Sequence, residues 1–231
     1  AIGSYSMDGA LDGATNNTAV GYKALTSITT SDENVAIGAE SMQLATTGNK
    51  NVAIGYQTMR YNLTGAHNTA IGHESMEGAS DNSHSHNTAI GVASLKAIET
   101  GASNIAIGNY ASGAVTTGSE NVVIGKSAFT TATTTANVVM IGHEAGKDVT
   151  SAESSVLIGH QAGREITTGN NNTALGHDSL GASGSSNITG HNNTAIGRRA
   201  GYNLEGSANA NTLVGQSAGA SITTGYENIL I

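Results

Sequence analysis

The chain repeats a five-residue motif, Asn-Thr/Val-Ala-Ile-Gly, about every 17 residues, and this repeat restricts the possible folds more than any other feature. Self-similarity at a short fixed period indicates stacked structural units, each too small to bury a core alone. The motif therefore predicts a solenoid or a fibre built from coils. The motif glycines are Gly3, Gly21, Gly38, Gly55, Gly72, Gly91, Gly108, Gly125, Gly142, Gly159, Gly176, Gly197 and Gly215.

Each motif alternates as a β-strand does, with Val35 and Ile37 on one face and Ala36 on the other. Both faces are apolar, which predicts a strand that is covered on both sides. We expect the Val, Thr and Ile face to line the interior of the coil and the Ala face to meet another layer or subunit. A small and then a large residue after each glycine, such as Ala24 and Leu25, predict a corner that points back inside. The sequence predicts an all-β fold, a parallel β-solenoid (β-roll) of about 13 coils.

Asparagine and glycine recur at fixed places in the unit. The asparagine before each strand predicts an amide ladder, in which each side chain bonds its neighbours above and below. The register shifts by one around Asn137, and Ser155 replaces asparagine in the next unit. Thr-Gly pairs such as Thr47-Gly48 predict turns in which glycine takes a positive φ. The repeat residues taken as structural are Asn34, Ile37, Gly38, Asn51, Ile54, Gly55, Asn68, Ile71, Gly72, Asn104, Ile107, Gly108, Asn121, Ile124 and Gly125.

Composition excludes several classes of partner. With 31 Gly, one Phe and no Trp, a single coil has few large side chains, which favours several chains packed side by side. The net charge of −8 comes without a basic stripe, so we expect no nucleic-acid partner. No apolar run approaches the roughly 20 residues of a membrane span, so we expect no membrane insertion by this segment. The absence of Cys removes disulfides and thiolate metal sites.

Three segments carry a family resemblance: TTGNKNVAIGYQTM, TTGSENVVIGKSAF and TTGNNNTALGHDSL. They resemble the YadA-like head repeats of trimeric autotransporter adhesins and similar repeats of bacteriophage tail fibres, although the 17-residue unit is longer than that of the adhesin heads. The resemblance implies a homotrimer of side-by-side rolls at a bacterial cell surface or in a virion tail fibre. It also implies a receptor-binding surface, with a host glycan or protein as the partner.

The function expected from the sequence is therefore structural and adhesive, in an extracellular, rigid trimeric fibre. Residues 1–231 are expected to be one repetitive segment of a longer fibrous protein. We expect no enzyme activity, catalytic residues or cofactor, because no nucleophile has a recognisable base beside it. The alternatives are a self-assembling extracellular filament and a monomeric ice-binding solenoid. The ice-binding alternative rests on the threonines at the first strand position, which the alternation assigns to the interior.

Histidines and two inserted loops are the remaining candidates for binding. The insertion between Met76 and Asn87 contains His84 and His86, for which a solvated polar loop is expected and a metal site is the alternative. His143, His160 and His177 recur 17 residues apart and are expected to stack at one exposed corner, with His73 at the same unit position; a metal-binding or pH-sensitive row is the alternative. The second insertion lies between Leu180 and Asn193. We expect the loops to carry binding more often than the repeats.

Overall fold

The computed structural model describes residues 1–79, 82–181 and 187–231. The chain forms two compact units, Ala1–Ser119 and Glu120–Ile231. The described residues form thirteen short strands and no helix. Unit 1 holds β1 (Thr18–Val20), β2 (Val35–Ile37), β3 (Val52–Ile54), β4 (Thr69–Ile71), β5 (Thr88–Ile90) and β6 (Ile105–Ile107). Unit 2 holds β7 (Val122–Ile124), β8 (Val139–Ile141), β9 (Val156–Ile158), β10 (Thr173–Leu175), β11 (Thr194–Ile196), β12 (Thr212–Val214) and β13 (Ile229–Leu230).

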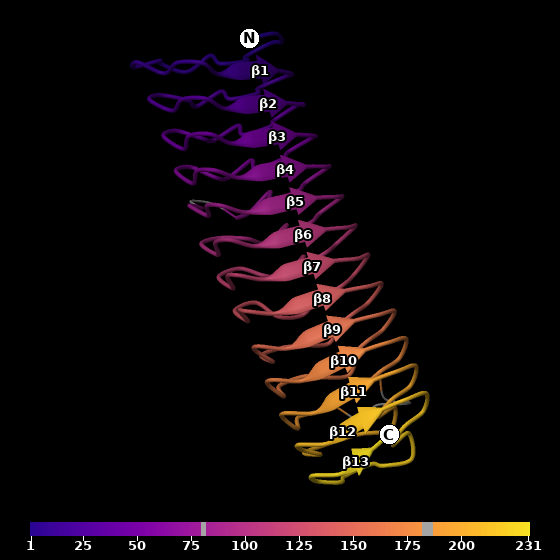
Figure 1. Ribbon diagram of the computed structural model, residues 1–231. Helices are drawn as coiled ribbons and strands as arrows, with labels where there is room; N and C mark the ends of the chain where they lie inside the picture. Colours follow the sequence, from indigo (N-terminus) through magenta and orange to yellow (C-terminus); the bar gives the residue numbers. More distant parts are fainter. Residues whose placement is uncertain (80–81, 182–186) are drawn as a thin grey trace. The chain divides into compact units, whose positions relative to one another are not determined.

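Within each unit, successive strands stack in chain order with one strand per turn (Figure 1). Every pair is parallel and in register, so that Val35 lies beside Val52 and Ile37 beside Ile54. The strands are joined by backbone hydrogen bonds, among them Val35 N to Asn51 O and Gly55 N to Ile37 O, both 2.8 Å. The all-β parallel solenoid with a period of about 17 residues is thereby confirmed.

The two faces of the strands are reversed relative to the expectation from sequence. The central alanines, such as Ala36 and Ala53, are fully buried inside the coil. The flanking residues point outward, and Ile37 and Ile71 are 38% and 37% exposed. The prediction that the Val, Thr and Ile face lines the interior was wrong, as was an outward-facing Ala layer. The corner side chains of these turns, Met42 and Met59, are also fully buried, and they fill the interior beside the alanine methyl groups.

The corner prediction is confirmed, since the large residue after each glycine is buried. Six of the coils with a central Ala carry Leu25, Met42, Met59, Met76, Leu95 and Leu180 there, all without exposed surface. Where the strand centre is larger, as at Met140 and Leu157, the corner residue is instead Gly146 or Gly163. A Cβ at either glycine would collide with the side chain of that strand residue. In these coils the large side chain therefore lies either on the strand or at the corner, whereas the turn of β7 buries both Val123 and Phe129.

The motif glycines permit close contact between turns. Gly38 has φ 135°, and a Cβ there would meet the backbone carbonyl of Gly55 in the next turn. The backbone of the Thr-Gly glycines differs from the prediction, because Gly48 does not have a positive φ. A Cβ on Gly48 would meet the carbonyl oxygen of Gly65. Glycine is needed at this turn for stacking distance, and the predicted positive φ was wrong.

The corners also use left-handed backbone at residues other than glycine. In one turn Gln57, Met59 and His67 have φ of 53°, 50° and 59°. The equivalent residues of the other turns repeat this conformation, which is uncommon for residues with a Cβ. The tight corners require it, and stacking of turn on turn holds it in place.

Candidate functional site

The asparagine ladder is the most regular polar feature of the interior. In unit 1 Asn51 Nδ2 donates to Asn34 Oδ1 at 3.1 Å and to the Gly65 carbonyl at 2.9 Å. Asn51 Oδ1 in turn accepts both the backbone N–H and the Nδ2 of Asn68, each at 3.0 Å. Both asparagines that flank Asn51 are buried, as it is. The predicted ladder is confirmed, and it satisfies buried polar groups on every turn it joins.

Unit 2 interrupts the ladder without shifting the strands. Val139 pairs in register with Val122 and with Val156, so the one-residue shift at Asn137 displaces the asparagine and leaves the strand in place. Asn137 is exposed with φ 60°, and the buried Val138 occupies the ladder position. In the next turn the hydroxyl of Ser155 accepts the backbone N–H of Asn172 at 3.2 Å. The ladder resumes from Asn172, whose Oδ1 accepts from Asn193 Nδ2 at 3.1 Å.

The first and third residues of the strands form an outward surface on each unit, here called the outer strand face. On unit 1 it presents Ile71, Ile90 and Ile105, which are 37% to 39% exposed. On unit 2 Val156, Leu175 and Ile196 are 36% to 44% exposed. The structural motif isoleucines therefore belong to the surface, while the motif asparagines belong to the interior.

Three histidines of unit 2 stack in a column, as the 17-residue spacing predicted. The ring centroids of His143 and His160 are 5.2 Å apart with 22° between the ring planes. His160 and His177 are 4.8 Å apart and nearly parallel, at 6°. In unit 1 the equivalent His73 packs on Tyr56 at 5.2 Å instead of on another histidine.

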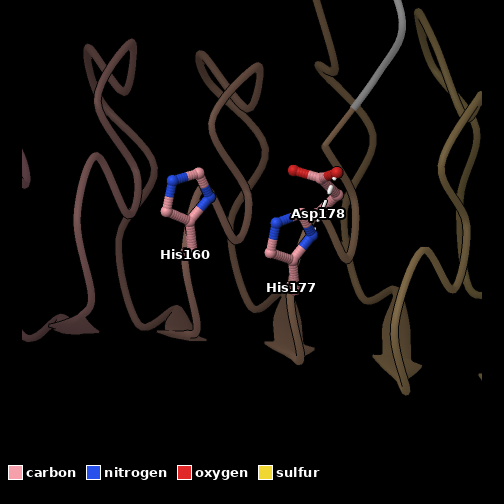
Figure 2. Close-up of side chains that lie close together, drawn as sticks. All are labelled: His160, His177 and Asp178. Atoms are coloured by element: carbon pink, nitrogen blue, oxygen red, sulfur yellow. Dashed lines mark ion pairs between the residues drawn. The ribbon is translucent and has the colours of Figure 1, made fainter.

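An acidic residue joins the end of this column. Figure 2 shows His160 and His177 side by side from successive turns, with the Asp178 carboxylate next to His177. His177 Nδ1 lies 3.1 Å from Asp178 Oδ2, which also faces Arg199 Nε at 3.5 Å. Asp178 was not expected from the sequence, although its position directly after a column histidine was the available signal. His160, His177 and Asp178 form the one group of three metal-type ligands among the described residues, with their ligand atoms within 4.8 Å of one another.

A second carboxylate beside the column, Glu144, is already occupied. Lys147 Nζ and Gln161 Nε2 donate to its two oxygens at 2.9 Å and 2.8 Å. These hydrogen bonds, that of Lys147 foremost, lower the pKa of Glu144 to about 2. Glu144 therefore remains ionised at neutral pH and is held by neighbouring donors.

His84 of the first insertion is buried, so the expectation of a solvated loop was wrong for this residue. The His84 backbone carbonyl accepts a hydrogen bond from Asn68 Nδ2 at 2.8 Å. One turn earlier, the Gly65 carbonyl accepts the equivalent hydrogen bond from Asn51 Nδ2. His84 thus occupies the Thr-Gly glycine position, with its imidazole enclosed. Neither ring nitrogen has a hydrogen-bond partner among the described residues. Desolvation lowers the pKa of His84 to about 4.

His84 and His86 do not come together as a His-x-His metal site. His86 is exposed and stacks on His67, with centroids 5.0 Å apart and 11° between planes. Asp81 of the same insertion lies outside the described residues, as do positions 182–186 of the second insertion. The inserted loops therefore contribute a buried histidine and an exposed ring stack, and the structure gives no grouped ligand set among their described residues.

Comparison of the chain with protein-family models, with curated proteins and with solved structures found no match. In the described part of the chain, no helix is long and apolar enough to cross a membrane. The candidate surfaces for function are therefore those given by the geometry itself: the outer strand face of each unit and the histidine column of unit 2.

Proposed function

We propose that this chain is a structural segment of an extracellular homotrimeric fibre, in a bacteriophage tail fibre or a bacterial surface adhesin. It serves as a rigid spacer and attachment surface, without enzymatic activity. The observation that carries the proposal is the outer strand face, whose partly exposed Val, Ile and Leu side chains recur on turn after turn.

The outer strand face is suited to contact with other copies of the chain. Its side chains stand in register, so the apolar residues of successive turns form continuous columns. Continuous apolar patches on a protein surface mark interaction sites more often than isolated apolar residues do. Burial of such surface stabilises an assembly by roughly 25 cal/mol per Å².

The trimer proposal rests on a different face from the one expected from sequence. Ala36 and its equivalents are inside the coil and cannot meet another subunit. The Val, Thr and Ile columns take over that role, and three identical columns can meet around one axis. The resemblance to YadA-like repeats supports three copies, and a host-surface glycan or protein remains the proposed partner.

The solution mass tests this proposal. We expect light scattering to give a mass of three chains at micromolar concentration. The double variant Ile71→Asp/Ile90→Asp places charges on the outer strand face and should give one chain with an unchanged circular dichroism spectrum. The matched control Thr30→Asp/Thr100→Asp changes exposed corner residues and should remain trimeric. A wild-type monomer would contradict the proposal, and a mass that grows with concentration would favour the filament.

An ice-binding solenoid is the second candidate, because the structure removes the argument against it. Thr69 and Thr88 lie in register on the outer strand face of unit 1, not in the interior. On unit 2, Thr173, Thr194 and Thr212 form a similar column. A trimer that uses this face would cover the threonines, so the two functions exclude each other. Thermal hysteresis measured on a monomeric wild-type protein would decide for ice binding.

A further inference from the structure

We propose that His160, His177 and Asp178 bind one divalent transition-metal ion, for which Zn²⁺ is the suitable probe. The site bridges two successive turns of unit 2, those that carry β9 and β10. His160 follows β9 by two residues and His177 follows β10 by two. The proposal concerns these side chains alone and does not depend on the trimer.

Two of the three ligands already have the spacing that a metal requires. Bonds from zinc to nitrogen and oxygen are about 2.0–2.2 Å, so two ligand atoms on one ion stand about 3–3.5 Å apart. His177 Nδ1 and Asp178 Oδ2 are separated by 3.1 Å. A metal ion can therefore replace the present contact between these atoms without a change in the backbone.

The third ligand needs only a side-chain adjustment. The parallel rings of His160 and His177 are 4.8 Å apart, which is too far for both to reach one ion as they stand. Both rings are exposed, and the side chain of His177 is 49% exposed. Rotation of an exposed imidazole about its side-chain torsions brings the His160 nitrogen, already within 4.8 Å of the Asp178 carboxylate, toward it. Solvent supplies the remaining coordination positions.

Asp178 is the available carboxylate of the column. Its side chain is only 11% exposed and is fixed beside His177, which reduces the entropy lost when it binds a metal. Arg199 is its other charged neighbour at 3.5 Å, and that side chain is 44% exposed, with its guanidinium also over the Tyr202 ring. Glu144, the residue after His143, already accepts hydrogen bonds from Lys147 and Gln161 on its two oxygens, so it is less available to a metal ion.

The ligand set selects the class of ion. Two imidazoles and one carboxylate suit Zn²⁺, Ni²⁺ or Cu²⁺, whereas Ca²⁺ and Mg²⁺ prefer oxygen ligands alone. An ion held by His160 from one turn and by His177 and Asp178 from the next cross-links the two turns. Because the unfolded chain lacks this geometry, metal binding should also stabilise the fold.

Unit 1 supplies a matched control at the same position of the repeat. His73 is followed by Glu74 as His177 is by Asp178, and its Nδ1 lies 3.7 Å from Glu74 Oε1. The neighbouring ring in that column is Tyr56, and Lys96 Nζ bonds Glu74 at 2.6 Å. The second imidazole is therefore missing from this position, and a lone His-acid pair should not hold the ion.

Titration of tag-free protein at pH 7.5 tests the site, with Zn²⁺ followed by calorimetry and Co²⁺ by its visible absorption. We expect one ion per chain. His160→Gln, His177→Gln and Asp178→Asn should each weaken binding at least about tenfold and reduce the Co²⁺ band, while His73→Gln should leave both unchanged. Metal-free melting curves establish that the variants fold.

A wild-type affinity equal to that of the His160→Gln/His177→Gln double variant would overturn the proposal. So would a loss of binding on His73→Gln of the same size as on His177→Gln. A Zn²⁺-dependent rise in melting temperature that is present in wild type and absent in the double variant provides a second readout of the bridge between turns.

Discussion

Met140 occupies the space into which any side chain at Gly146 would project. A Cβ on Gly146 would collide with the Met140 sulfur and approach its Cε to 2.9 Å. In a unit 1 turn the arrangement is the opposite, with Ala36 on the strand and Met42 at the corner. Strand centre and corner, six residues apart, share one interior volume.

Moving the large side chain from the strand centre to the corner of the same turn should therefore be tolerated. Met140→Ala alone leaves a cavity and should cost about 2–5 kcal/mol of unfolding free energy. Gly146→Met alone overfills the interior and should cost at least about 1–3 kcal/mol. The double variant reproduces the Ala36/Met42 arrangement and should recover most of the loss, as measured by urea unfolding. Additive costs in the double variant would show that the two sites do not share a volume.

Removal of a ladder asparagine should strongly destabilise unit 1. Asn51→Ala removes the acceptor of the Asn68 backbone N–H and the shorter of the two hydrogen bonds to the Gly65 carbonyl, and we expect a loss of about 3 kcal/mol. Asn137→Gly is the control, because Asn137 is exposed, lies outside the ladder and has a left-handed φ of 60°. Its unfolding free energy should change by less than about 0.5 kcal/mol. Equal losses in the two variants would argue against a stabilising ladder.

The motif glycine should not accept a methyl group. Gly55 has φ 141°, and a Cβ there would meet the Gly72 carbonyl and come within 2.7 Å of Thr58 Oγ1. Gly55→Ala should lower the unfolding free energy by at least about 3 kcal/mol or prevent folding. Gly113→Ala provides the comparison, because its nearest atom would be 3.4 Å away, and it should be neutral or stabilising by up to about 1 kcal/mol. Thermal melts of both variants measure the difference.

His84 should make the fold sensitive to mild acid. Burial lowers the pKa of His84 to about 4, whereas the unfolded chain has an ordinary histidine pKa near 6.5. Between pH 4 and pH 6.5, His84 is protonated in the unfolded chain and neutral in the folded chain. Stability is therefore complete above about pH 6.5 and falls by about 3 kcal/mol as the pH drops to 4.

Urea unfolding of wild type and His84→Met between pH 7.5 and 4 isolates this effect. Methionine keeps an apolar volume in the site without a titrating group, so the variant should lose the histidine contribution while the carboxylates titrate as before. His86→Gln is the control, since His86 is exposed, and it should follow the wild-type curve. A pH dependence that is identical in wild type and His84→Met would contradict the assignment to His84.

Much of the fold could be predicted because it repeats locally. The spacing of motif glycines fixed the period, and the asparagines at one position gave the ladder, as Asn34 and Asn51 show. The histidine stack followed from the same 17-residue spacing, since in-register turns bring residues 17 apart into contact. Asp178 escaped detection because its place beside His177 depends on the left-handed corner backbone, with φ 55°.

The sequence by itself determined the period, the parallel in-register stacking and the residues that share a column, because these follow from repetition. Only the tertiary structure decided which strand face is inside. Alternation assigns Ala36 and Ile37 to opposite faces of the strand but does not say which face points into the coil. The Ala36 face points inward because the Met42 side chain at the corner fills most of the interior. The tertiary structure also decided that His84 is buried, because the position of the insertion within the turn determines which of its residues takes the Thr-Gly glycine position.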